Sequence, residues 1–178
     1  EVRCLGRAAH SSRPGLGTNA ISLARMALEA LDRLAVAWEK ERRFADHLEC
    51  PFTVMNVGMI EGGTAVNIVP DHCTFRVGIR PLPGEPEQQR IDEIRAVLTP
   101  VQSQAIRMAG QISVEVLQIA PALLTPEGTP LEALLCPHAT NPKPTAAPFA
   151  TDGGNLNRLD IESLVFGPGS IDVAHRPN

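Results

Sequence analysis

One histidine of the chain lies where an imidazole can act on a substrate. His10 belongs to the segment Gly6–Ser12, which is expected to form a loop between a strand and a helix, and small residues surround it. An imidazole in such a loop can approach a substrate and donate a hydrogen bond to an oxyanion. The spacing also fits an ordinary surface histidine. Ser11 and Ser12 are not expected to be nucleophiles, because capping of the loop and helix explains them.

A second histidine, His175, follows an apolar segment that runs into Gly167–Ser170. It would lie just past the carboxyl end of a strand, which is where open α/β sheets bind ligands. Imidazole is the commonest metal ligand in proteins. A catalytic zinc uses about three protein ligands, and nothing near His175 completes such a set, so an ordinary histidine remains the alternative.

Asn67 and Arg80 bracket a strand expected over residues 72–80. The Arg80 guanidinium can hold a carboxylate through paired hydrogen bonds. The alternative is a salt bridge on an exposed sheet face. Gly62 and Gly63 do not indicate a phosphate loop, because they lack the lysine and the following helix that cradle a phosphate.

The composition excludes two classes of partner. The 178 residues include 16 Lys and Arg against 20 Asp and Glu, a net charge of -4, which argues against a nucleic-acid binder. No apolar run approaches the roughly 20 residues of a membrane helix. The four cysteines are far apart and are expected to be reduced and mostly buried, as in a cytoplasmic protein. Because the chain opens with Glu1 rather than methionine, we expect a piece of a longer protein.

The elements that must position these residues follow from periodicity. Apolar residues at spacings of three and four predict a helix over 21–38, capped by Thr18 or Asn19. A second helix is expected after Pro86, and strands over 2–6, 52–60, 72–80 and 112–119, with a turn at 61–63. The order strand, helix, strand, strand, helix, strand predicts an α+β fold. It is a ferredoxin-like arrangement, with two helices on one face of a four-stranded antiparallel sheet.

The amino-acid composition changes at Pro121, after which prolines become frequent. We expect a linker with a short helix near 131–135, a strand near 146–150, a short helix over 154–159 and a strand over 163–166. Such a remnant buries too little surface to be stable alone. It is interpreted as part of a larger α/β sheet.

Three segments, taken in order, resemble one enzyme family. They are Gly6–Ser12 with the residues up to Ala20, Glu61–Pro70 followed by Arg80–Gly84, and Gly167–Ser170 followed by Ala174–Pro177. Together they resemble the acetylornithine deacetylase and succinyl-diaminopimelate desuccinylase family of metallopeptidases, and the acetylornithine deacetylases most of all.

The resemblance implies a lid and dimerisation domain over residues 1–120 and a piece of the zinc catalytic domain over 121–178. It implies two zinc ions in the full-length enzyme, with cobalt as an alternative, and His175 as a metal ligand. His10 would reach into the partner subunit's site and stabilise the oxyanion, and Asn67 and Arg80 would hold the substrate's carboxylate. The implied reaction is hydrolysis of an N-acyl amino acid, N-acetylornithine first, in arginine biosynthesis, by a cytoplasmic homodimer.

The family's other metal ligands and its general-base glutamate precede the lid, and this chain lacks them, so the isolated chain is expected to be inactive. Thr151 and Asp152 stand where the acetylornithine deacetylases tend to have Thr-Glu, which leaves the substrate open. Two alternatives remain: the same chemistry on another N-acyl amino acid or a dipeptide, and a non-catalytic dimerisation or binding module.

Overall fold

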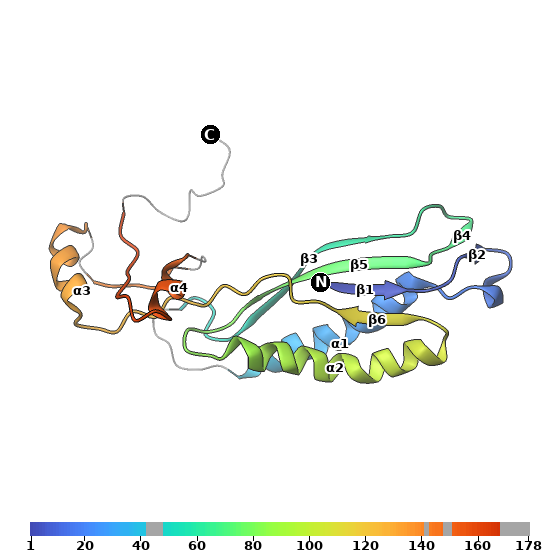
Figure 1. Ribbon diagram of the computed structural model, residues 1–178, viewed down its shortest axis with the longest axis horizontal. Coiled ribbons are helices and arrows are strands. Elements are labelled where there is room, and N and C mark those ends of the chain that lie inside the picture. Colours follow the sequence, from blue (N-terminus) through green and yellow to red (C-terminus); the bar gives the residue numbers. More distant parts are fainter. Residues whose placement is uncertain (42–47, 141–142, 148–150, 168–178) are drawn as a thin grey trace. The chain divides into compact units, whose positions relative to one another are not determined.

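The computed structural model describes residues 1–41, 48–140, 143–147 and 151–167 (Figure 1). The chain forms two compact units. The first comprises residues 1–42, 52–81 and 85–119, and the second comprises 43–51, 82–84 and 120–178. Within the described ranges, no helix has the length and apolar character needed to cross a membrane.

The first unit is a four-stranded antiparallel sheet with two long helices on one face (Figure 1). The strand order is β3-β5-β1-β6, and each neighbouring pair is antiparallel. The bounds are β1 Val2–Leu5, β3 Val54–Gly62, β5 His72–Arg80, β6 Gln111–Val114, α1 Ala20–Lys40 and α2 Glu87–Arg107. This confirms the α+β, ferredoxin-like arrangement expected from the sequence.

Helix α1 begins where its cap is satisfied. The Asn19 side chain accepts a hydrogen bond from the Ser22 backbone N–H at 3.0 Å, which pairs one of the free donors of the first turn. The apolar stripe then faces the sheet, and Leu23, Leu31 and Trp38 are fully buried. The predicted amphipathic helix is therefore confirmed, with each end within two residues of expectation.

Strand β5 shows the alternation that the sequence predicted. Cys73 and Phe75 are buried against the helices, whereas His72 and Arg76 are exposed on the other face. Leu98 of α2 is fully buried in the same core. Two faces of different polarity fix the strand register, because a slip of one residue would expose the apolar set.

A buried ion cluster lies where the first unit's elements end. Arg90 of α2, 2% exposed, bonds to the Glu85 carboxylate at 2.9 Å and to Glu93 at 2.9 Å. Its guanidinium also lies 5.1 Å from the centre of the Trp38 ring. Burial by itself lowers the pKa of Arg90, but the hydrogen bonds to the carboxylates outweigh it and raise the pKa. The charge is therefore retained in the interior. The Thr53 hydroxyl donates a further hydrogen bond to Glu85.

Two strand boundaries differ from the predictions. Strand β3 continues through Glu61 to Gly62, because both pair with β5, and the chain turns only at Gly63, where φ is +76°. Strand β6 ends at Val114 instead of residue 119. Its last residue, Val114, pairs with Val2 of β1.

The second unit is described by itself. It contains α3 Pro130–Leu135, the 3-10 turn η2 Cys136–His138 and α4 Gly153–Asn157. The two short helices were expected. The prediction of a strand over 163–166 is wrong, because those residues pair with no strand. Of the strand expected near 146–150, the structure describes residues 146–147, and these are not in a strand either. A segment with strand propensity forms a β-strand only where a neighbouring strand pairs with its backbone N–H and C=O groups.

Candidate functional site

His10 lies at the end of a short strand that the sequence pattern did not reveal. Strands β2 (Ala9–His10) and β4 (Ile68–Val69) form a separate two-stranded antiparallel sheet, in which His10 is opposite Ile68. The 3-10 turn η1 (Pro14–Leu16) follows. His10 is exposed, so its ring is available to a ligand.

Two glycines let this loop close on itself. A Cβ at Gly6 would lie 2.0 Å from the Thr18 carbonyl oxygen, and one at Gly17 would lie 2.8 Å from the Arg7 carbonyl oxygen. Both obstacles are main-chain atoms, which cannot rotate away as a side chain can. Arg7 and Thr18 exchange two backbone hydrogen bonds of 2.9 Å across the base of the loop. The loop that carries His10 is therefore fixed by its backbone.

The pairing of β2 with β4 brings two of the predicted site residues together. The Ser11 backbone N–H donates to the Asn67 carbonyl oxygen at 2.9 Å, next to His10. Asn67, like His10, is exposed. His72 donates a hydrogen bond to the Asp71 carboxylate at 3.0 Å, which lowers the pKa of Asp71 and keeps a negative charge nearby.

Arg80 is not part of this group. It is the last residue of β5, opposite Val54, whereas the β2–β4 sheet adjoins the His72 end of β5. Eight residue steps of about 3.3 Å separate the two ends, or about 26 Å. One copy of the chain therefore cannot bring His10, Asn67 and Arg80 onto the same small molecule.

The fourth predicted residue, His175, lies outside the described residues. Among the residues that are described, no three His, Cys, Asp or Glu side chains gather in a way that could hold a metal ion. The described residues thus do not fit a zinc site.

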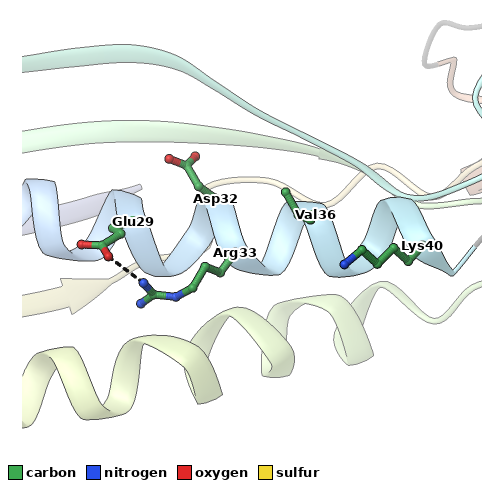
Figure 2. Close-up of a pocket in the computed structure, with 5 residues that line it drawn as sticks. All are labelled: Glu29, Asp32, Arg33, Val36 and Lys40. Carbon is green, nitrogen blue, oxygen red and sulfur yellow. Dashed lines mark hydrogen bonds and ion pairs between the residues drawn. The ribbon is translucent and has the colours of Figure 1, made fainter.

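An open surface hollow runs along the outer face of α1 (Figure 2). It is lined by Glu29, Asp32, Arg33, Val36 and Lys40, all from one helix, with an ion pair of 2.7 Å between Glu29 and Arg33. Because a single helix lines it and its charges are of both signs, we interpret the hollow as ordinary helix surface. None of the predicted site residues lines it.

One contact of the site was missed from the sequence. Ser12 hydrogen-bonds the His10 ring through both its hydroxyl and its backbone N–H. The available signal was position: in a reverse turn, the N–H two residues after an acceptor side chain points back to it, as it does after Asn or Asp.

The first unit is a small α+β domain with an exposed histidine in a loop at one end of its sheet. Comparison with known proteins identifies the class. Residues 1–106 match the family model M20_dimer, described as a peptidase dimerisation domain. The chain belongs to this family of the M20 peptidases.

Curated relatives carry the particular name that the sequence resemblance indicated. The chain is 32% identical over 178 residues to an acetylornithine deacetylase from Myxococcus xanthus, covering 99% of this chain and 45% of the relative. It is 33% identical to the acetylornithine deacetylase of Proteus mirabilis (strain HI4320), covering 99% of this chain and 44% of that protein. It therefore spans less than half the length of these relatives.

Solved structures agree on the fold. A tripeptidase from Staphylococcus aureus superposes with a TM-score of 0.66 at 21% identity, covering 90% of this chain and 40% of that one. The aminopeptidase PepT from Bacillus cereus gives a TM-score of 0.63, also at 21% identity, covering 90% of this chain and 41% of that one. At this identity the likeness speaks for the architecture alone.

Proposed function

We propose that the chain is the dimerisation lid, with an adjoining catalytic-domain segment, of a metal-dependent amidohydrolase that deacetylates N-acetylornithine in the cytoplasm. The observation that carries the proposal is similarity to acetylornithine deacetylases along 99% of the chain. The second preference is the same hydrolysis of another N-acyl amino acid or a dipeptide. The metal pair, zinc or else cobalt, belongs to the whole enzyme. His175 would be one of its ligands.

The lid's own contribution is to bind and stabilise. His10 would donate a hydrogen bond from its ring to the oxygen that becomes negative when the amide carbonyl is attacked, which lowers the barrier of that step. The Asn67 amide and the Arg80 guanidinium would hold the carboxylate of the amino acid and orient its acyl group.

The separation along β5 supports a site shared between two subunits. Since about 26 Å lies between the Arg80 end and the His10 end of that strand, a substrate that touches both must take them from different copies. A homodimer formed through the lid, with two-fold symmetry, offers two such sites. The family description, a peptidase dimerisation domain, supports the same assembly.

Mixing two impaired variants of the full-length parent tests this arrangement. His10→Ala should lower kcat by about 10²- to 10³-fold, as loss of an oxyanion donor does, and Arg80→Ala should raise KM. When the two variants are unfolded, mixed and refolded, each mixed dimer should regain one intact site, because His10 of one chain then meets Arg80 of the other. No recovery in dimers shown to be mixed would contradict the shared site.

Two measurements test the activity itself. The parent should release acetate from N-acetylornithine. The variant His72→Ala, which changes an exposed histidine at the start of β5, should retain that activity as a matched control. The 178-residue chain alone should show none. Hydrolysis by the isolated chain would overturn the division of labour proposed here, and a parent without hydrolase activity would favour a non-catalytic dimerisation module.

A further inference from the structure

The His10 ring is held by its own turn. The Arg13 backbone N–H donates to the His10 carbonyl at 2.8 Å, which closes a reverse turn over Ser11 and Ser12. Inside that turn, the His10 Nδ1 atom lies 2.7 Å from the Ser12 hydroxyl and 3.2 Å from the Ser12 backbone nitrogen. The Nδ1 atom of His10 therefore contacts two groups of Ser12, the hydroxyl and the backbone N–H.

The second contact decides which nitrogen carries the proton. A hydroxyl can donate or accept, so the Ser12 Oγ contact alone permits either tautomer. A backbone N–H can only donate, so the Nδ1 atom that it approaches must be the acceptor. The Ser12 hydroxyl then donates as well, and the proton of the neutral ring sits on Nε2.

We infer that Ser12 is a positioning residue that fixes His10 as an Nε2–H donor. The inference rests on the proposed function in one respect, that an oxyanion is what the Nε2–H meets. The other tautomer would present a lone pair to the developing negative charge and repel it. Ser12 thus selects the proton position that the reaction requires, without touching the substrate.

The loop's backbone keeps the turn in place independently of Ser12. The Ser11 N–H bond to Asn67 and the close packing of Gly6 against Thr18 hold both sides of the loop. A change of the Ser12 side chain can therefore alter the ring without unfolding the loop. Ser11→Ala is the matched control, because Ser11 contributes to the turn through its backbone.

Nitrogen NMR of the histidine rings tests the inference directly on the 178-residue chain. Long-range ¹H–¹⁵N spectra at neutral pH distinguish a protonated from an unprotonated ring nitrogen, and a His10→Gln variant assigns the His10 signals among the five histidines. Wild type should show Nδ1 unprotonated and Nε2 protonated. Ser12→Ala should lower the Nε2–H to Nδ1–H ratio about fivefold, the equivalent of one hydrogen bond of about 1 kcal/mol.

Ser12→Thr, which keeps the hydroxyl, should restore the wild-type ratio, and Ser11→Ala should not change it. An Nδ1–H signal in the wild type, or a ratio in Ser12→Ala equal to that of wild type, would overturn the inference. Kinetics of the full-length parent separate it from the proposed function: Ser12→Ala should lower kcat with little change in KM. A changed tautomer ratio with unchanged kcat would refute the oxyanion role of His10 and leave the role of Ser12 standing.

Discussion

Replacing Arg90 by methionine should strongly destabilise the first unit. Methionine fills part of the volume but removes the cation, so the buried negative charge of Glu85, whose side chain is 3% exposed, is no longer neutralised by Arg90. Breaking a buried pair in this way costs about 3–5 kcal/mol, out of a total stability of roughly 5–15 kcal/mol for a domain. The loss of the contact with Trp38 acts in the same direction.

Urea unfolding followed by the fluorescence of Trp38 measures the effect, because it is the chain's single tryptophan and is fully buried in the first unit. With a slope of about 2 kcal/mol per molar urea, Arg90→Met should lower the midpoint by about 2 M. Arg95→Met is the matched control, since Arg95 is an exposed arginine of the same helix, paired with Asp92 at 3.5 Å. It should change stability by less than about 0.5 kcal/mol.

The same cluster predicts a pH dependence. Burial alone would raise the pKa of Glu93, but hydrogen bonds from Gln89, Arg90 and Trp38 outweigh it and lower the pKa below the ordinary value of 4.5. A lowered pKa stabilises the fold above pH 4.5, and this stabilisation is lost as the pH falls through the native value. Arg90→Met should show a smaller loss in that acidic range. Equal stability losses in Arg90→Met and Arg95→Met would refute the reasoning.

Three further predictions concern packing and accessibility. Gly6→Ala should lower the unfolding free energy by about 1–3 kcal/mol, because its methyl group meets the Thr18 carbonyl; an unchanged urea midpoint would contradict this close approach. Leu98→Ala should cost about 2–5 kcal/mol in the same assay, since the side chain is fully buried. Cys4 and Cys73 should not react with a thiol reagent until the chain unfolds, because burial raises the pKa of both thiols, that of Cys4 to about 12; rapid labelling of the folded chain would refute their burial.

The sequence predicted the elements whose pattern is local. Helix α1 carries an apolar stripe over five turns and a capping Asn19, and β5 alternates over nine residues, so each reports its own buried face. Strand β6 pairs with β1, more than a hundred residues away along the chain, and no local pattern contains that pairing. The local sequence also does not show whether residues 163–166 have a strand to pair with, and in the structure they have none.

The sequence named candidate site residues but did not indicate their geometry. A resemblance in motif order selected His10, Asn67 and Arg80, yet only the two-residue strands β2 and β4 show that the first two are neighbours. Strands that short have no periodicity to detect. Only the nine-residue length of β5 shows that Arg80 is remote from them.

The Arg90 cluster and the His10 loop lie at opposite ends of this sheet. The Arg90 cluster gathers Thr53 and Glu85, which flank the end where β3 begins and β5 finishes, whereas the His10 loop adjoins the other end through the bond from the Gly6 N–H to the Asp71 carbonyl, at 2.7 Å. Between them lies the length of the β3–β5 ladder, about 26 Å. Sites so far apart, with no shared partner, contribute almost independently. The loop can therefore present an exposed, backbone-fixed histidine because the buried pair and the helices, not the loop, stabilise the sheet.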